Sequence, residues 1–283
     1  MELARLKTVV LALLLCINLL LAGHLLLTQY LRYHIPAWAK DEITELLQNK
    51  GIALSDRALP HFDRKIDSVV YPGDEEKRKA IATALLGSDA KCTEQGGGII
   101  VYENEKGYAE FGRGGRLQIT LQSDGNVPAE EAVPSSSAET EQAAIGLLRS
   151  AGISVPKGAK VFGRQGDGVF VRFQHTVRRL DVKNAALEVH FLPNKTIISG
   201  TLLTGRAQPS PTRMRGYVSL LADFAAISKQ YSLEVKEITR ISYVYYHTVD
   251  EEGRPLLIPA CLIETNNRIL VLNAGDGSLL ESN

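Results

Sequence analysis

The 283-residue sequence predicts an α+β protein with a single N-terminal transmembrane helix, followed by an extracytoplasmic region of antiparallel sheets with helices on one face. Two observations predict this class. An almost continuous apolar run, VVLALLLCINLLLAGHLLL, stands near the start of the chain. After it, an amphipathic helix followed by alternating strand segments occurs three times, in units that begin near residues 74, 137 and 215.

Composition narrows the class of protein. Apolar residues make up 45% and charged residues 23%, which favours a folded core over disorder. The 32 basic and 32 acidic residues cancel, which disfavours a nucleic-acid-binding protein. Three cysteines are too few for a disulfide scaffold, although one bridge between Cys92 and Cys261 stays open. No Cys or His pair has the spacing of zinc ligands.

The apolar run Val9–Leu27 predicts an uncleaved membrane anchor. With Thr8 it has about 20 residues, which span about 30 Å of hydrocarbon as a helix. Arg5 and Lys7 precede it, so the N-terminus is expected in the cytoplasm and the remainder outside, as in a single-pass cell-membrane protein. A cleaved signal peptide is the alternative, but its apolar region is usually shorter and ends in small residues. We therefore expect residues 1–33 to form the cytoplasmic tail and the anchor.

Two polar residues, Asn18 and His24, interrupt this anchor and are the predicted partner-binding residues. An amide or imidazole within hydrocarbon favours a hydrogen bond to a neighbouring membrane helix. The alternative is that a single anchor tolerates one Asn and that His24 lies near the outer headgroups. Tyr30, Tyr33 and Trp38 follow the run and suit that outer interface.

The predicted N-terminal lobe covers residues 34–125. Pro36 should end the membrane helix, and an amphipathic helix is expected over Ala37–Asn49. A second helix is predicted over Asp74–Leu86, with acidic residues at its N-terminus. Two or three short strands follow between Gly98 and Leu121.

Residues 126–137 are the predicted linker between lobes, because Asp124–Ser137 holds no large apolar cluster. The C-terminal lobe is predicted over residues 138–283. Ser136-x-x-Glu139 resembles a capping box and should open a helix that runs to about Ser150. Another helix is expected over Gly216–Tyr231. Period-two alternation or turn spacing predicts strands at Val169–Val177, Leu187–Phe191, Thr196–Thr204, Ile241–Val249, Leu256–Glu264 and Arg268–Leu272.

No motif in the sequence predicts catalytic, cofactor-binding or metal-binding residues, and we expect a protein that is not an enzyme. Gly163–Gly168 is glycine-rich but fits a hairpin turn better than a phosphate-binding loop. His175 and His247 fall on apolar strand faces, where a hydrogen-bonded core imidazole is the common outcome. Glu188 and Glu264 are the only carboxylates that we name as a possible catalytic pair. The basic clusters Arg178-Arg179 and Arg213/Arg215 are interpreted as solvated faces.

The order of segments resembles the YycH/YycI family, and is closest to YycI-like members. The resemblance rests on the anchor, on LLQNKGI and ALLG in the N-terminal half, and on FQHTVRRLDVKNAALEVHFLPNKTIISGTLLTG from Phe173. The segment from Ile238, ITRISYVYYHTVDEEGRPLLIPACLIETNNRILVLNAGDGSL, is the best match. Cys261 stands where the family usually has Trp, and this departure bears on the subfamily.

This resemblance implies a regulator that binds a Wal/YycG-type sensor histidine kinase and a YycH-like partner, as a hetero-oligomer in the membrane, and so acts on cell-wall homeostasis. We therefore expect a kinase modulator that uses helix–helix and ectodomain contacts. One alternative is an extracytoplasmic ligand-binding module for wall fragments or peptides. Another is a secreted hydrolase whose site forms only in the folded chain.

Overall fold

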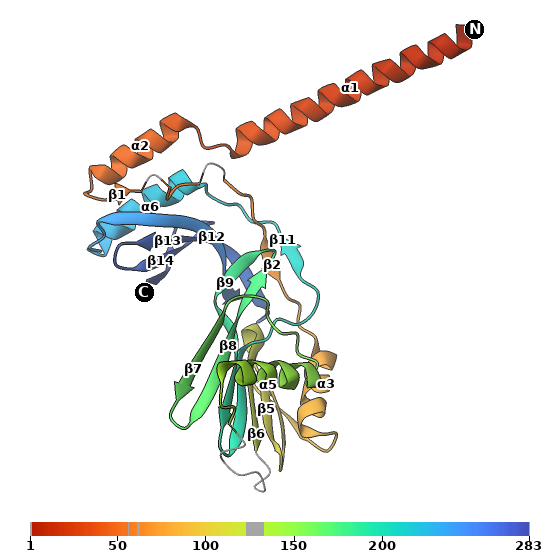
Figure 1. Cartoon of the computed structure of the whole chain (residues 1–283), viewed down its shortest axis with the longest axis vertical. Helices are drawn as coiled ribbons and strands as arrows, with labels where there is room; N and C mark the ends of the chain where they lie inside the picture. Colours follow the sequence, from red (N-terminus) through yellow and green to blue (C-terminus); the bar gives the residue numbers. More distant parts are fainter. Residues whose placement is uncertain (1, 56, 61–62, 123–132, 283) are drawn as a thin grey trace.

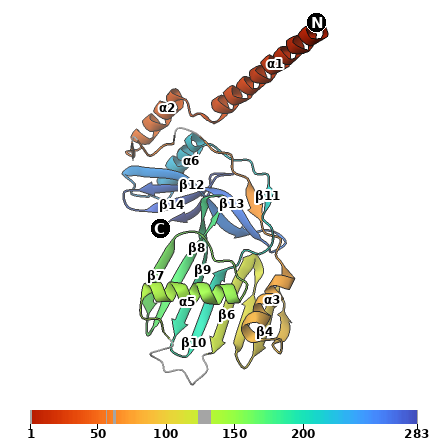
Figure 2. The same cartoon turned by 45° about the vertical axis from the view of Figure 1, so that its right-hand side comes forward.

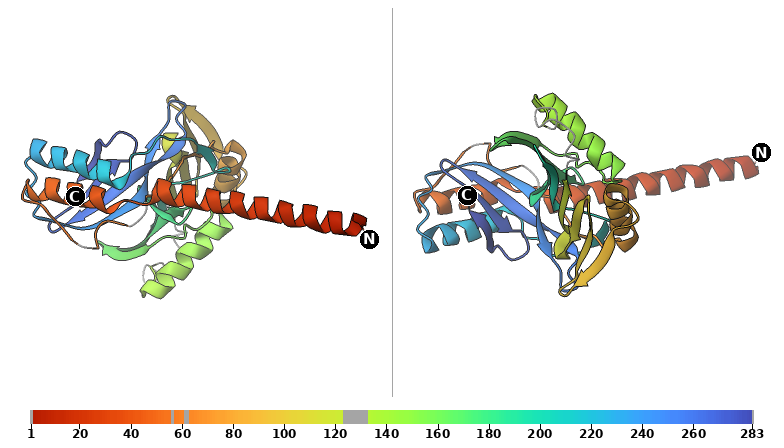
Figure 3. Two further views of the ribbon diagram at one scale, coloured as in Figure 1. Left: turned by 90° about the horizontal axis from the view of Figure 1, so that it is seen from above. Right: turned by 90° about the horizontal axis from the view of Figure 1, so that it is seen from below.

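The computed structural model describes residues 2–55, 57–60, 63–122 and 133–282, and its architecture is α+β, as predicted. Helix α1 (Glu2–Tyr33) projects from a sheet-rich region that carries the remaining helices (Figure 1). Views from above and below show α1 extending well beyond the folded region (Figure 3). The predicted antiparallel sheet with a few packed helices is therefore confirmed.

Helix α1 contains the predicted anchor. Its segment Val10–Thr28 is long and apolar enough to cross a membrane, and none of that segment is buried. The helix ends at Tyr33, and α2 (Ala37–Gln48) begins directly after Pro36, as the geometry of proline predicts.

The strands of the described region form one large sheet with a branched strand order. Its main path runs β11-β2-β13-β12-β9-β10-β6-β5-β4-β3, and most neighbours pair antiparallel. The strands are β1 (Ala53–Leu54), β2 (Ser68–Val70), β3 (Lys91–Gln95), β4 (Ile99–Asn104), β5 (Gly107–Phe111), β6 (Arg116–Gln122), β7 (Lys160–Gln165), β8 (Gly168–Val177), β9 (Leu180–Leu192), β10 (Lys195–Thr201), β11 (Gln208–Ser210), β12 (Glu237–Val249), β13 (Pro255–Thr265), β14 (Ile269–Asn273) and β15 (Leu279–Ser282).

The three predicted helix-plus-strand units are present. Helix α3 (Glu75–Leu86) precedes β3–β6, α5 (Ser137–Ser150) precedes β7–β10, and α6 (Tyr217–Gln230) precedes β12–β15. The first unit has one more strand than the maximum predicted, because β3 is exposed along its whole length and shows no apolar alternation.

Helix caps follow the sequence closely. Asp74 caps α3 by accepting a hydrogen bond from the amide of Lys77 at 2.9 Å. Ser136 caps α5 by accepting from the amide of Glu139 at 3.3 Å. The return bond of the expected capping box is shifted by one residue, because the Glu139 carboxylate accepts from the amide and hydroxyl of Ser135.

Two hydrophobic cores lie along the sheet. The first core packs α2 and α6 on β12 and β13, and includes Ile43, Leu220, Phe224, Tyr245 and Ile263. The second core packs α3 and α5 on one face of β4–β6 and β8–β10, with α5 lying across the strands (Figure 2). Members of the second core are Ile81, Leu86, Phe111, Ile119, Ala144, Leu148, Val171, Phe173, Leu187, Val189 and Ile198.

These cores do not follow the predicted lobes of residues 34–125 and 138–283. Residues 35–69 share the first core with residues from the C-terminal part of the chain, while α3 and α5 share the second. The predicted boundary misses this because the short strand β2 pairs with β13, a partner distant in sequence. Most of the predicted linker 126–137 lies outside the described residues, and α5 begins at Ser137.

The two cores are joined through a continuous sheet. Strand β9 pairs in parallel with β12 at Val182 and Tyr245. The loop at Gly114, where φ is 66°, fits against the β12–β13 hairpin so closely that a Cβ would lie 2.6 Å from Val249. Its amide donates to the carbonyl of Gly253 at 2.8 Å.

The cysteines are all free thiols, so the open question of a Cys92–Cys261 bridge is resolved against it. Cys92 is exposed on β3 and Cys261 is buried on β13. Burial raises the pKa of the Cys261 thiol far above its ordinary value.

Candidate functional site

The predicted partner-binding residues lie on an unpacked helix. Asn18 and His24 are both exposed on α1, six positions apart. Positions six apart in a helix do not share a face, so the two side chains point in different directions. They are therefore open to separate contacts.

The junction between α1 and the folded region is held by a buried side chain. Ile35, between α1 and α2, is only 3% exposed and belongs to the first core with Ala39 and Ile43 of α2. Only three residues separate α1 from α2. The anchor is therefore connected to the folded region through a packed residue.

One face of the sheet formed by β8, β9 and β10 is polar. Arg172, Glu188 and Ser199 occupy this face, whereas Val171, Val189 and Ile198 point toward α5. Among the described residues, the helices that pack on these strands lie on the apolar face (Figure 2). A hollow of about 410 Å³ on the polar face is lined by Arg172, Gln174, Asn184, Ala185, Ala186, Glu188, Ser199, Gly200 and Thr201.

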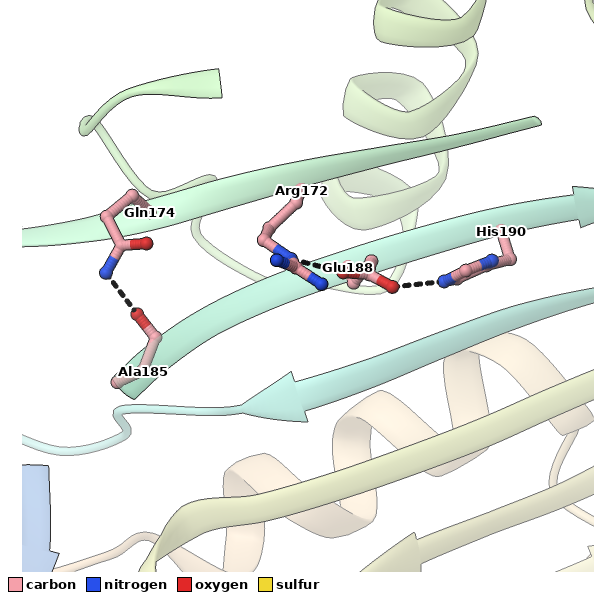
Figure 4. Close-up of polar contacts among 5 residues, drawn as sticks. All are labelled: Arg172, Gln174, Ala185, Glu188 and His190. Atoms are coloured by element: carbon pink, nitrogen blue, oxygen red, sulfur yellow. Dashed lines mark hydrogen bonds and ion pairs between the residues drawn. The ribbon is translucent and has the colours of Figure 1, made fainter. Parts of the chain in front are cut away.

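Glu188 is the centre of the polar interactions on this face (Figure 4). Its carboxylate accepts from Arg172 on one side and from His190 on the other. Burial would raise the pKa of Glu188, but these hydrogen bonds and the Arg172 charge lower it below its ordinary value. The His190 ring in turn stacks on Phe170 with centroids 5.1 Å apart. The result is a carboxylate held between one imidazole, which itself stacks on Phe170, and a guanidinium.

Gln174 fixes the neighbouring end of this face. Its amide nitrogen donates to the carbonyls of Val182 and Ala185, the latter at 2.9 Å (Figure 4). A register shift between Gln174 and Thr176 accompanies this contact. The side-chain amide therefore donates hydrogen bonds to backbone carbonyls that the irregular pairing of β8 and β9 leaves without a backbone donor.

The structure separates the two carboxylates that we considered as a catalytic pair. Glu188 is bonded to Arg172 and His190 on β8 and β9, whereas Glu264 of β13 lies 3.8 Å from Arg240. Each carboxylate thus has its own arginine. Within the described ranges, no group of three or more His, Cys, Asp or Glu side chains is arranged to hold a metal ion.

His175 and His247 are hydrogen-bonded, as predicted, but they are half-buried at the edge of the cores and not within them. The Nε2–H of His175 donates to the carbonyl of Thr201 at 2.8 Å, and that of His247 to the carbonyl of Gly114 at 2.8 Å. Burial lowers the pKa of both imidazoles below 6.5. The His247 bond crosses between the two cores.

Sequence reasoning missed Arg172 and His190 as partners of Glu188. The alternation of β8 places Arg172 opposite the apolar residues, and this signal was visible in the sequence. The cross-strand register that brings Arg172 to Glu188 is set by two features together. One is a hairpin of two left-handed residues, Arg178 and Arg179, which has no glycine or asparagine to mark it. The other is the register shift between Gln174 and Thr176.

Comparison with solved structures finds distant structural neighbours, among them the two below. No family model matches the chain, and no curated protein matches it. An uncharacterized protein from Eubacterium rectale ATCC 33656 is 11% identical, with a TM-score of 0.44, over 81% of this chain and 90% of its own. The YpeB C-terminal domain of Bacillus megaterium is 10% identical, with a TM-score of 0.38, over 78% of this chain and 98% of its own. No family match supports YycH/YycI, so that assignment stays a prediction.

Proposed function

We propose that this protein is a membrane-anchored regulator whose sheet-rich region lies outside the cytoplasm and biases the activity of a sensor histidine kinase. The observation that carries the proposal is the junction of α1 with the first core. The apolar segment Val10–Thr28, none of which is buried, is joined to a packed domain through the buried side chain of Ile35. A partner that binds α1 within the membrane would thereby be linked to the outer domain.

Modulation of this kind requires unequal binding to two states of the partner. A regulator shifts an equilibrium only by the difference between its affinities for the two conformations. Asn18 supplies a hydrogen-bonding group within hydrocarbon, where the register of a partner helix determines whether the bond forms. The YycH/YycI resemblance supports a Wal/YycG-type kinase and a YycH-like protein as the partners.

Co-purification tests the proposal. The full-length protein is isolated from native membranes in a mild detergent, beside a variant whose residues 8–27 are replaced by an unrelated apolar helix. We expect mass spectrometry to detect a sensor histidine kinase with the native protein and to find it depleted with the replaced anchor. Asn18→Leu should reduce the yield of kinase, and Leu20→Ile, which keeps the helix apolar, is the matched control. Absence of any kinase from the native preparation would contradict the proposal.

A second candidate function is an extracytoplasmic ligand-binding module for wall fragments or peptides. The polar face around Glu188 favours it, because a hollow of about 410 Å³ there combines charged, amide and hydroxyl groups. This function predicts that replacement of the anchor leaves binding unchanged and that Arg172→Ala abolishes it. Binding of solubilised wall fragments to the full-length protein distinguishes the two candidates.

A further inference from the structure

A basic cavity lies where the segment Asp63–Asp67 meets the turn between β8 and β9. Its volume is about 480 Å³. Its lining includes Arg64, Lys65, Ile66, Arg178, Leu180 and Tyr245. Tyr245 is fully buried, and its hydroxyl donates to the carbonyl of Asp67 at 3.0 Å, which fixes the floor of the cavity.

A second cavity of about 360 Å³ adjoins the first and shares Arg64 and Lys65 with it. It adds Arg213 and Arg215 from the segment before α6. Together the two linings contain five basic and two acidic residues, in a chain whose net charge is zero. The excess of positive charge is therefore local.

The acidic residues of the described lining, Asp63 and Asp67, offset part of this charge but form no direct ion pair with the cations. Asp63 accepts from the amide of Tyr217 at 2.9 Å and from the hydroxyl of Tyr243 at 3.1 Å. Arg215 is paired with Asp223 at 2.6 Å. Over the part of the chain that the structure describes, no ion pair joins Arg64, Lys65, Arg178 or Arg213 to a carboxylate. These four cations come from three segments distant in sequence.

The backbone conformation of the turn between β8 and β9 indicates that its two arginines do more than keep the surface soluble. Arg178 and Arg179 have φ values of 50° and 67°, a left-handed conformation that Asn and Gly adopt at much lower cost. Arg178 lines the first cavity, and Arg179 lines a further cavity that also contains Arg64. Unfavourable residues kept at a turn point to a function of their side chains.

We propose that Arg64, Lys65, Arg178 and Arg213, here called the basic pocket, bind a phosphate-bearing anion. Guanidinium groups donate two parallel hydrogen bonds to the oxygens of a phosphate, and cations along two adjoining cavities that share Arg64 and Lys65 suit an anion with many oxygens. Leu180, which is partly exposed, offers apolar surface to the organic part of the ligand, and the buried Ile66 and Tyr245 support the lining from behind. The phosphate can belong to a lipid headgroup or to a soluble compound. This site goes beyond the regulatory role and does not depend on it.

The test uses the full-length protein in neutral-detergent micelles, with inorganic pyrophosphate as the probe at constant ionic strength. Calorimetric titration should show saturable binding, and the midpoint of thermal unfolding should rise with pyrophosphate. Arg64→Gln and Arg178→Asn should each weaken binding by at least tenfold. Arg178→Asn is the decisive variant, because Asn suits the left-handed turn and should unfold at the same or a higher temperature than the native protein. Arg164→Gln, exposed on β7, is the matched control and should bind normally.

Two results would overturn the proposal: no saturable binding by the native protein, or equal affinity in the native protein and Arg178→Asn. The source of the phosphate is resolved in nanodiscs of phosphatidylcholine with and without phosphatidylglycerol. A lower apparent affinity for pyrophosphate in the phosphatidylglycerol discs than in discs made equally negative with a phosphate-free anionic lipid identifies a lipid headgroup in the basic pocket. An unchanged affinity identifies a soluble ligand. None of these binding measurements requires the kinase. The anion-binding proposal and the proposed regulatory function can therefore each fail without the other.

Discussion

The carboxylate of Asp63 accepts the backbone amide hydrogen of Tyr217 at 2.9 Å, across 154 positions of sequence. Gly216, which precedes α6, has no side chain to cap the helix, and Asp63 takes that role from a distant segment. The same oxygen accepts from the Tyr243 hydroxyl, and the Tyr217 and Tyr243 rings stack with centroids 4.1 Å apart. One carboxylate thus connects the segment after α2, the last helix and the central strand β12.

Replacement of Asp63 should destabilise the folded region. Asp63→Ala removes the cap of α6 and one acceptor of Tyr243, and we expect a loss of about 1–3 kcal/mol in the free energy of unfolding. This loss is measured by urea unfolding of the full-length protein in detergent, monitored by circular dichroism. Asp67→Asn is the control, since Tyr245 is bonded to the backbone carbonyl of residue 67, and its stability should stay near that of the native protein.

Shortening a buried side chain of the second core should lower the free energy of unfolding more than shortening a half-buried neighbour on the same helix. Leu148 of α5 is fully buried, so Leu148→Ala should lower the free energy of unfolding by about 2–5 kcal/mol through lost burial and a residual cavity. Leu147→Ala, one position earlier and half-buried, should cost distinctly less. Equal costs for the two variants would contradict the packing of α5 on the sheet.

Stability should fall as the pH drops through the range where histidine titrates. Burial lowers the pKa of His175 and His247 in the folded protein, so the unfolded chain binds more protons below its ordinary value of 6.5. The stabilisation is fully present above pH 6.5 and declines below it. Unfolding free energies measured between pH 7.5 and pH 5 should decrease, and the slope should be shallower in His247→Gln.

Carboxylates affect the stability of the folded protein in a separate and lower pH range. Hydrogen bonds lower the pKa of Glu188 and Asp250, so their contribution is present above the ordinary values of 4.5 and 3.8 and is lost as the pH falls through the lowered pKa. A pH profile that is flat from 7.5 to 5 and falls only below 4.5 would mean that the imidazoles do not contribute.

The free thiol of Cys92 reports which side of the membrane the folded region occupies. Cys92 is exposed on β3, whereas Cys261 is buried and its thiol pKa is raised, so Cys261 should not react in the folded protein. A membrane-impermeant maleimide should label intact cells at Cys92, and Cys92→Ser should abolish this label. Labelling that appears only after lysis would place the folded region in the cytoplasm.

The sequence predicts elements better than their pairing. The helices of the folded region lie close to their predicted bounds because apolar periodicity and the caps at Asp74 and Ser136 are local signals. The hairpin at Gly163–Gly168 and the hydrogen-bonded histidines followed from turn chemistry and alternation. These features depend on neighbours within a few positions.

Long-range features were not visible in the sequence. Strands β1, β2 and β11 have two or three residues each, too few to show periodicity, yet β2 carries the segment after α2 onto β13. The division into two cores depends on that pairing. The sequence favours solvated faces for Arg178 and Arg213 and does not single out Arg64, because these three side chains line adjoining cavities only in the folded chain.

The most direct test of the central proposal is the rate of autophosphorylation of the kinase in proteoliposomes, with and without this protein. The kinase is the one identified by co-purification. We predict that the native protein changes this rate several-fold in either direction, and that the variant with residues 8–27 replaced loses most of the effect. An unchanged rate at saturating amounts of native protein would contradict a regulatory role.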